Sequence, residues 1–470
     1  MRRFTAVISV FATCIFIGLA ISGANAQGQL PADVAEKIDK IAAETLGRTG
    51  VPSASVAVVK DGQIVFSKAY GDARLEPKAA AAAQMRYSIG SISKQLTATA
   101  VLLLQEQGKL SLDDKVAKYI PDLTRANEVT IRQLLSHTSG YQDYWPQDYV
   151  MKPMLEPTTA QKIMDTWAKK PLDFEPGTKW QYSNTNYVIA GAIVEKVAGI
   201  PFFKFLQQRV FTPLGMTSVM DIDQERLTES DPIGYKRYAL GPLRLAPKEG
   251  KGWLFAAGEL AMTAQDLAKW DVSIIDRKLM KPDSYQALGT ETLLKDGSGT
   301  NYGLGVSVGS QGGRRVLSHG GEVSGFTATN IVFPDDRAAI VVLTNQDAAS
   351  ASGPIAGGIS PLLFATNDPA TAAKLEQAKK IFEGLQQGTI ERSLFTDNAN
   401  AYFSEEALAD FKSSLGPLGV PQSFTQASQS LRGGMVGRVF LVRFKDKTVR
   451  AWTYEMPDGK LEQFQVAVQN

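Results

Sequence analysis

Cysteine is nearly absent from this sequence, with one among 470 residues, and histidine is scarce, with two. The single cysteine, Cys14, lies in an N-terminal apolar stretch, so the rest of the chain offers no disulfide, thiolate nucleophile or thiolate metal site. The two histidines, His137 and His319, are far apart in the sequence, which gives little support to a zinc centre. We therefore expect no metal site and no cofactor.

A surplus of charge of one sign is also missing. The chain has 50 Lys and Arg residues against 48 Asp and Glu residues, a formal charge of +2. Two of the basic residues are Arg2 and Arg3, and without them the two signs would balance. Proteins that bind nucleic acid are usually strongly basic, so the composition argues against nucleic acid as the main partner.

Residues 1–26 contain no acidic residue and have the pattern of a secretory signal. Arg2 and Arg3 precede an apolar run from Val7 to Ile21, and Ala24-Asn25-Ala26 supplies the small residues of a cleavage site. We expect cleavage after Ala26 and a mature protein that is periplasmic or secreted, exported by the general or the twin-arginine route. No later stretch is long and charge-free enough to predict a stable membrane span.

The length predicts two folded domains. We expect a larger α+β domain over residues 27–366, a linker at Asn367-Asp368-Pro369-Ala370, and a small α+β accessory domain over residues 371–470. In the accessory domain, helical patterns at 372–385 and 405–413 precede strand patterns at 423–431, 438–444, 448–454 and 461–468. This order of elements is similar to that of nuclear-transport-factor-like domains.

In the larger domain the spacing of apolar residues changes along the chain. A hairpin at Asp61-Gly62 joins two strands, the middle has helical spacing, and alternation returns after residue 300. This order predicts one antiparallel sheet, built from both ends of the domain and flanked by a large helical subdomain. Strands are expected at 53–59, 64–70, 302–308, 315–318, 327–333 and 338–344, and helices from about residues 32, 91, 130, 187, 201, 263 and 354. Residues 222–252, rich in Pro, Gly and charge, are expected to cover a cleft.

Ser91 and Lys94 stand at the start of a predicted helix. Residues three apart share a helix face, so the Ser91 hydroxyl and the Lys94 amine can meet there. An amine beside a hydroxyl can take its proton, and a helix N-terminus favours developing negative charge. Because Ser-x-x-Lys arises by chance in long chains, the motif alone is equally consistent with a polar cap on a core helix.

Two further groups of residues could complete such a site. Tyr182 and Asn184 lie on a loop before a predicted helix, and a nearby lysine cation would favour the phenolate form of Tyr182. His319-Gly320-Gly321 lies at the end of a predicted strand, where glycines would let a substrate lie against the strand edge.

Other polar residues have a simpler interpretation. We interpret His137 as a hydrogen-bonded histidine that fixes a turn rather than as a catalytic base. Glu259 and Asp266 fit a helix cap and its neighbour better than a catalytic role. The apolar cluster at Trp253-Leu254-Phe255 could line a substrate wall, although core packing is the commoner use of such residues.

The three motifs, in this order, resemble those of the serine β-lactamase and penicillin-recognising hydrolase family, most closely its class C-like branch of esterases and D-amino-acid-specific peptidases. The resemblance covers about residues 32–365. It also extends to the segments Ile131 to Gly140, Phe174 to Gly177 and Tyr302 to Gly305.

The resemblance implies a β-lactamase/transpeptidase-like fold and an acyl-enzyme mechanism. Ser91 would be acylated, Lys94 would help remove its proton, and Tyr182 would serve as general base and acid. The implied site consists of the catalytic Ser91, Lys94 and Tyr182, the substrate-binding Asn184, His319, Gly320 and Gly321, and the oxyanion-binding backbone N–H groups of Ser91 and Glu322.

One departure from the family pattern bears on the substrate. Strict β-lactamases carry Lys-Thr-Gly, with a cation and a hydroxyl for a substrate carboxylate, where this chain has His319-Gly320-Gly321. Since histidine is only partly charged at neutral pH, we expect an ester or amide, of a D-amino acid or a small acyl group, that lacks this carboxylate. A class C-like β-lactamase or peptidoglycan D,D-peptidase, and a non-catalytic binding protein on the same scaffold, are the alternatives. The sequence does not indicate the oligomeric state.

Overall fold

The computed structural model describes residues 29–348, 351–364 and 369–468. The expected signal peptide, with Cys14, lies outside the described residues. The chain divides into two compact units, the first comprising residues up to Gly309 with Arg315–Ser360, the second Ser310–Arg314 with the residues from Pro361 onward. Among the helices of the described part, none is both long and apolar enough to cross a membrane.

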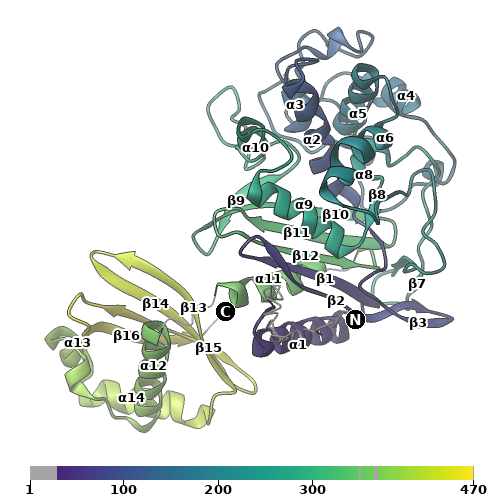
Figure 1. Cartoon of the computed structure of the whole chain (residues 1–470). Coiled ribbons are helices and arrows are strands. Elements are labelled where there is room, and N and C mark those ends of the chain that lie inside the picture. The colour runs from purple at the N-terminus through teal and green to yellow at the C-terminus, as the bar shows by residue number, and fades with distance from the viewer. Residues whose placement is uncertain (1–28, 349–350, 365–368, 469–470) are drawn as a thin grey trace, which may run out of the picture. The chain divides into compact units, whose positions relative to one another are not determined.

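A seven-stranded sheet forms the centre of the first unit (Figure 1), with the strand order β3-β2-β1-β12-β11-β10-β9. Its strands are β1 (Ser53–Lys60), β2 (Gln63–Leu75), β3 (Lys78–Ala80), β9 (Ser307–Gln311), β10 (Arg314–Val323), β11 (Phe326–Phe333) and β12 (Ala338–Thr344). Strand β1 pairs antiparallel with both β2 and β12, and Ala54 lies opposite Thr344. The prediction of one sheet built from both ends of the domain is therefore confirmed.

Helices cover both faces of this sheet. Figure 1 shows α9 (Ala264–Asp276) on the same side as the helical region, with α1 (Ala32–Thr49) and α11 (Ser352–Leu363) on the other. Strand β1 is consequently buried from Ser53 to Val59, as expected for a strand that packs on both faces. The helix predicted from about residue 32 is α1, and it has an apolar stripe in which Ile38, Ala42 and Leu46 are buried.

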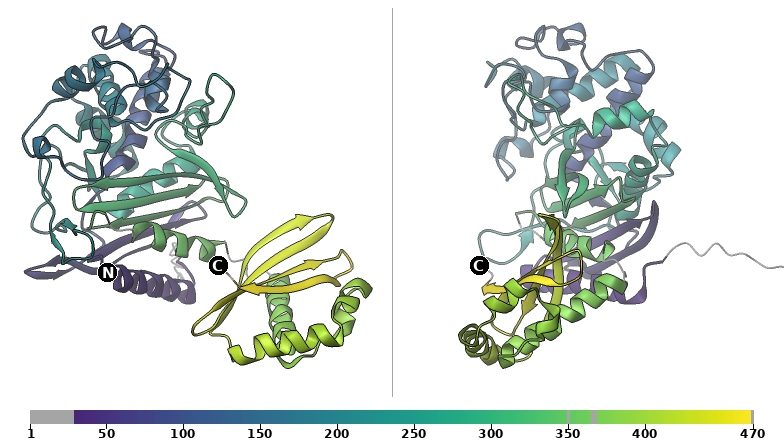
Figure 2. Two further views of the ribbon diagram at one scale, coloured as in Figure 1. Left: turned by 180° about the vertical axis from the view of Figure 1, so that it is seen from behind. Right: turned by 90° about the vertical axis from the view of Figure 1, so that its left-hand side faces the viewer.

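Helix α2 (Ser93–Glu106) runs through the core of the helical region, and all its residues from Ser93 to Leu104 are buried. It packs against α5 (Asn184–Ala198), α8 (Phe255–Gly258) and α10 (Pro282–Leu288), and Figure 2 shows this region from two further sides. Shorter helices complete it: α3 (Ile131–Leu135), α4 (Ala160–Ile163), α6 (Phe202–Leu206) and α7 (Thr212–Leu214). The helix predicted from residue 91 starts two residues later, because Ser91 belongs to a 3₁₀ turn, Gly90–Ile92, that leads into α2.

A small sheet fixes the approach to this turn. Strand β4 (Tyr87–Ser88) pairs with β8 (Leu260–Met262), which also pairs with β5 (Met220–Asp221). The buried Tyr87 hydroxyl lies 2.9 Å from Ser53 Oγ at the start of β1. The chain therefore enters the Ser91 turn from a position that is tied to the central sheet.

One strand prediction is wrong. Residues 302–308 were expected as a strand, but β9 begins only at Ser307, and the preceding residues form a turn. Gly305 has a φ of +76°, which a strand cannot accommodate, and a β-carbon there would lie 2.7 Å from the Lys94 carbonyl oxygen. The segment thus packs against the start of α2.

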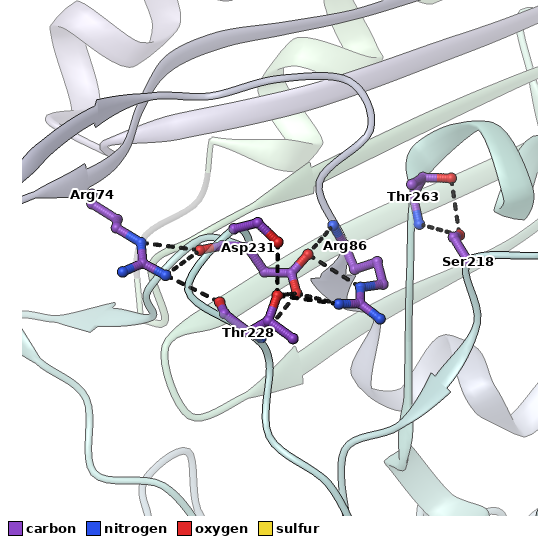
Figure 3. Close-up of polar contacts among 7 residues, drawn as sticks. Arg74, Arg86, Ser218, Thr228, Asp231 and Thr263 are labelled. Carbon is purple, nitrogen blue, oxygen red and sulfur yellow. Dashed lines mark hydrogen bonds and ion pairs between the residues drawn. The ribbon is translucent and has the colours of Figure 1, made fainter.

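Residues 222–252 contain little regular structure, namely β6 (Tyr235–Lys236) and β7 (Arg244–Leu245), and are anchored through Asp231 (Figure 3). The Asp231 carboxylate pairs with Arg86 at 2.6 Å and accepts the Thr228 backbone N–H at 3.0 Å. Arg74 donates to the Asp231 carbonyl oxygen. The Asp231 carboxylate is buried and Arg86 is only partly exposed, so this ion pair and its hydrogen bonds attach the irregular segment firmly.

The second unit contains α12 (Pro369–Gln387), α13 (Asp397–Tyr402) and α14 (Glu405–Leu415), followed by a four-stranded sheet. Strands β13 (Ser423–Arg432), β14 (Met435–Arg443), β15 (Thr448–Glu455) and β16 (Leu461–Val468) pair antiparallel in sequence order. A phenylalanine-rich core that includes Phe382, Phe403 and Phe440 joins helices and sheet.

The predicted order of helices followed by strands is confirmed in this unit, and the likeness to nuclear-transport-factor-like domains stays a prediction. Pro369 and Ala370, expected in a linker, instead begin helix α12. Proline is well tolerated in the first turn of a helix, where its missing N–H is not needed.

Candidate active site

Two glycines shape the turn that carries Ser91. Gly90 has a φ of +50°, and a β-carbon there would lie 2.7 Å from the Glu322 backbone nitrogen. At Gly321 a β-carbon would lie 1.9 Å from the Ile89 carbonyl oxygen. A side chain at either position would push strand β10 away from the Ser91 turn. The glycines therefore bring the edge of β10 directly against Ser91.

Lys94 is fully buried, and its amine has three polar neighbours. Nζ lies 2.9 Å from Ser91 Oγ, 2.8 Å from Asn184 Oδ1 and 2.7 Å from the Ala257 carbonyl oxygen. Burial lowers the pKa of Lys94 to about 7, against the opposing effect of the Asp143 carboxylate. At neutral pH a substantial fraction of this amine is therefore unprotonated.

These neighbours also fix the direction of the amine lone pair. Asn184 Oδ1, in the orientation found, and the Ala257 carbonyl oxygen can only accept hydrogen bonds, so they take the two N–H groups of the neutral amine. The lone pair then faces Ser91 Oγ, whose O–H can donate to Nζ. This is the arrangement of a general base beside a hydroxyl nucleophile.

Asp143, which the sequence analysis did not single out, holds Asn184 in the required orientation. Its carboxylate accepts the Asn184 backbone N–H at 2.9 Å and the Asn184 side-chain amide at 3.2 Å. The amide nitrogen is thereby turned toward Asp143, and Oδ1 is left toward Lys94. Asp143 follows the segment Ile131 to Gly140 in sequence, but no spacing rule relates it to Asn184.

Tyr182 lies against both Ser91 and Lys94. Lys94 Nζ is 5.0 Å from the centre of the Tyr182 ring, and the Ser91 side chain acts to lower the pKa of the Tyr182 hydroxyl. Burial raises the pKa of Tyr182, and the opposing effect of Ser91 does not offset it. The expectation that Lys94 would favour the phenolate is therefore wrong, because loss of hydration dominates. Tyr182 keeps its proton at neutral pH and is poised as a proton donor.

His319 is buried and engaged by protein groups at both ring nitrogens. Its Nδ1–H donates to the Gly320 carbonyl oxygen, which leaves Nε2 to accept the Tyr302 O–H at 2.9 Å. Burial and the nearby positive charge of Lys94 lower the pKa of His319 to about 4. The partial charge expected from the sequence is thus absent at neutral pH, and His319 supplies no cation for a carboxylate.

Ser91, Tyr182, Asn184 and His319 face one cleft of about 920 Å³. Residues 143–150, which connect α3 to the following helices, also line this cleft. None of the residues that line it belongs to 222–252, so the prediction that this segment covers the cleft is wrong. That segment instead borders an adjoining cavity of about 300 Å³, which shares Val323 and Ser324 with the cleft, since Asp231 anchors it beside Arg74 and Arg86.

The charged groups on the cleft wall are all acidic. Among the described residues that line it there is no lysine or arginine, and the carboxylates are those of Asp143, Asp148, Glu322 and Asp347. Partial dehydration raises the pKa of Glu322, and the Asp148 and Asp347 carboxylates raise it further. The cleft therefore has a negative potential toward its mouth.

The structural interpretations of the remaining residues, as a turn, a helix cap and core packing, agree with the structure. His137 accepts the Ser183 backbone N–H at Nδ1, at 3.2 Å, and lies in a turn. Asp266 is in the first turn of α9, where its N–H bonds the Thr263 hydroxyl, and Glu259 caps the end of α8. Trp253 is buried against Tyr144 and Trp167, so it packs in the core, although Leu254 lines the cleft.

No group of three or more His, Cys, Asp or Glu side chains able to hold a metal ion occurs in the part of the chain that the structure describes. The cleft wall near Ser91 consists of hydroxyl, amine and amide groups and neutral imidazole. These groups suit acyl transfer through a hydroxyl nucleophile.

Comparison with known proteins gives a consistent picture. The sequence matches the Beta-lactamase family over residues 38–357. Penicillin-binding protein 4* of Bacillus subtilis (strain 168) is 28% identical over 319 residues, which cover 65% of this chain and 70% of that protein.

Two solved structures extend the comparison. The D-amino acid amidase of Ochrobactrum anthropi SV3, complexed with L-phenylalanine amide, is 26% identical with a TM-score of 0.61, over 71% of this chain and 97% of that chain. A penicillin-binding protein homologue from Pyrococcus abyssi is 20% identical with a TM-score of 0.62, over 93% of this chain and 98% of that one, which shows the fold alone.

Proposed function

The chain belongs to the beta-lactamase family and is a serine hydrolase, and we propose that it hydrolyses an ester or amide through an acyl-enzyme on Ser91. The observation that carries this proposal is the environment of Lys94 Nζ, with two acceptors on one side and Ser91 Oγ at 2.9 Å on the other. A pKa of about 7 keeps this base available at neutral pH.

In the acylation step, the Ser91 oxygen attacks the substrate carbonyl carbon while its proton passes to Lys94 Nζ. Tyr182, which holds its own proton, donates it to the leaving nitrogen or oxygen as the bond to the acyl carbon breaks, and Lys94 returns the proton to Tyr182. The Ser91 ester and the free amine or alcohol are the products of this step.

In the deacylation step, water attacks the ester carbon and gives a proton to Lys94 Nζ. Tyr182 donates its proton to Ser91 Oγ as the bond from this oxygen to the acyl carbon breaks, Lys94 returns the proton to Tyr182, and the carboxylic acid leaves. The backbone N–H groups of Ser91 and Glu322 would stabilise the oxyanion in both steps, since Gly90 and Gly321 bring the two segments together. One such donor contributes about 3 kcal/mol of transition-state stabilisation.

We further propose that the substrate lacks a free carboxylate and carries a free amine, as in a D-amino-acid amide or ester. Neutral His319 offers no cation, and the acidic wall would repel a carboxylate and attract an ammonium group. The likeness to a D-amino acid amidase supports this ranking over a β-lactamase or a peptidoglycan D,D-peptidase. We also propose that the protein is exported after cleavage of residues 1–26.

A fluorophosphonate probe followed by mapping of the adduct tests the reaction. We expect labelling of Ser91 in the wild type and none in Ser91→Ala; labelling at another residue, or an inert wild type, would favour a non-catalytic binding protein. A panel of D-alanine amide, N-acetyl-D-alanine amide, a p-nitrophenyl ester and nitrocefin then tests the substrate class. Fast nitrocefin turnover with negligible amidase and esterase activity would reverse the ranking in favour of a β-lactamase.

A further inference from the structure

His137 contacts Tyr182 and both of its neighbours in the sequence. Its carbonyl oxygen accepts the Gln181 N–H at 3.0 Å, and its Nδ1 accepts the Ser183 N–H at 3.2 Å. Between these two bonds, the His137 ring lies on the Tyr182 ring, with centroids 4.3 Å apart and planes at 36°. The residues on both sides of Tyr182, and its ring, are therefore held by one residue.

His137 itself is held rigidly. Its side chain is fully buried, and its φ of +59° is a conformation that His, Asn and Asp tolerate better than most residues. Its ring also contacts Trp180 and Tyr302, with centroids 6.1 Å and 5.0 Å away. These contacts restrict the movement of the His137 ring.

The hydrogen bonds also define the tautomer of His137. Since Nδ1 accepts a backbone N–H, the proton of the neutral ring is on Nε2, which no group among the described residues accepts. Burial, aided by the positive charge of Lys94, keeps the pKa of His137 well below its usual value. The ring is therefore neutral, and its Nδ1 stays free to accept the Ser183 N–H.

We propose that His137 is the positioning residue for Tyr182, holding its hydroxyl between Ser91 and the leaving group of the substrate. The inference rests on the proposed function, because it assigns His137 a role only through Tyr182. His137 is fully buried and does not line the cleft, so it touches neither the substrate nor the reacting atoms.

Two substitutions at His137 separate its side-chain hydrogen bond to Ser183 from its ring contact with Tyr182. In His137→Asn the Oδ1 atom is two bonds from Cβ, as Nδ1 is, so the bond to Ser183 can remain while the ring contact is lost. In His137→Phe a ring remains but the acceptor is lost. Thr138→Val is the matched control, because Thr138 is equally buried in the same turn and its side chain bonds Ser136, not Tyr182.

The readout is the difference between two leaving groups on the same acyl group. A p-nitrophenolate leaves without a proton, whereas an amide nitrogen must be protonated, which is the task proposed for Tyr182. We expect each His137 variant to lower kcat/KM on the amide, which reports the acylation step, by about 10- to 100-fold, with a much smaller loss of kcat/KM on the ester. Thr138→Val should change both substrates equally.

Three outcomes would overturn the inference: equal losses on ester and amide, no loss on either, or an undiminished effect of the His137 substitutions in the Tyr182→Phe background. Thermal melting checks that each variant is folded, and His137→Asn, the milder change, decides the matter if His137→Phe unfolds. A wild type that the fluorophosphonate probe does not label at Ser91 would instead refute the proposed function.

Discussion

Around Ser91 the cleft is lined by half-buried and buried side chains with several partners each, whereas the wall at residues 145–150 contains no helix or strand and no buried residue. Lys94 is fully buried with three hydrogen bonds, while Tyr149 is 68% exposed. The inner part of the cleft, formed by the residues around Ser91 and Lys94, thus fixes the positions and protonation states that the proposed reaction depends on. The outer wall, residues 145–150 with the carboxylates at the cleft mouth, presents charged and apolar groups on irregular backbone. Such a surface suits selection of the substrate.

The strongest test of the inner part is removal of the nucleophile. Ser91→Ala should lower kcat/KM on every ester and amide by at least about 10⁴-fold, because Ser91 Oγ is the only hydroxyl that Lys94 Nζ bonds among the residues that the structure describes. Initial rates with a fluorogenic ester measure the loss. Retention of more than a few per cent of the rate would mean that the inner part does not carry the reaction.

Removal of the base should have the next largest effect. Lys94→Met should lower kcat by about 10²- to 10⁴-fold while the protein stays folded, since methionine fills most of the buried volume. In the wild type, activity requires the neutral amine, so kcat/KM should rise with pH through about 7, the pKa of Lys94. A profile that is flat from pH 5.5 to 8.5 would contradict this assignment.

The lowered pKa of Lys94 should also make the stability of the fold depend on pH. Because burial lowers the pKa of Lys94 from its usual 10.5 to about 7, the unfolded chain binds more protons than the folded one between these values. The free energy of unfolding should therefore rise with pH across this window, relative to Lys94→Met. Urea unfolding of both proteins at pH 7 and pH 9.5 measures the difference, and parallel behaviour would show that Lys94 is already charged in the fold.

Asp143 connects the inner part with the outer wall, and a change there should have an intermediate effect. In Asp143→Asn the new amide would oppose the Asn184 amide, and loss of the negative charge should lower the pKa of Lys94 further. We expect kcat to fall by about tenfold and the acidic limb of the pH profile to move to lower pH. An unmoved limb would show that Asp143 does not act on Lys94.

The outer wall should show the smallest effects, and only with charged substrates. Asp148→Asn and Asp347→Asn should each raise KM for a D-amino-acid amide with a free amine by about two- to fivefold, as expected for partly exposed charges. The N-acetylated amide should change by less than about twofold. Equal changes with both amides would mean that the acidic wall does not select for an amine.

The inner part was largely predictable from the sequence because its residues belong to ordered motifs. Ser91 and Lys94 are related by helix geometry. Tyr182 lies just before α5 and Asn184 begins it, and the apolar spacing predicts this helix although it places the start at residue 187. What escaped prediction depends on contacts between distant segments: Asp143 on Asn184, and the burial that sets protonation states.

The wrong predictions about the fold have similar causes. The alternating pattern at Tyr302 to Val308 suggested a strand, but Gly305 at positive φ packs against Lys94 instead. Residues 222–252 were expected to cover the cleft because of their composition, whereas the Asp231 anchor decides where they lie. Composition identifies an irregular segment but does not determine which surface it covers.

The pairing of β1 with β12 constrains how the protein can fold. The Ser53 N–H donates to Asn345 Oδ1 across 292 positions in the sequence, and β1 is buried on both faces. During synthesis the first strand has only its hairpin partner β2 until the chain beyond Thr344 has emerged. Contacts of such long range slow folding, so we expect the Ser91 turn to reach its final geometry only after nearly the whole first unit has been made.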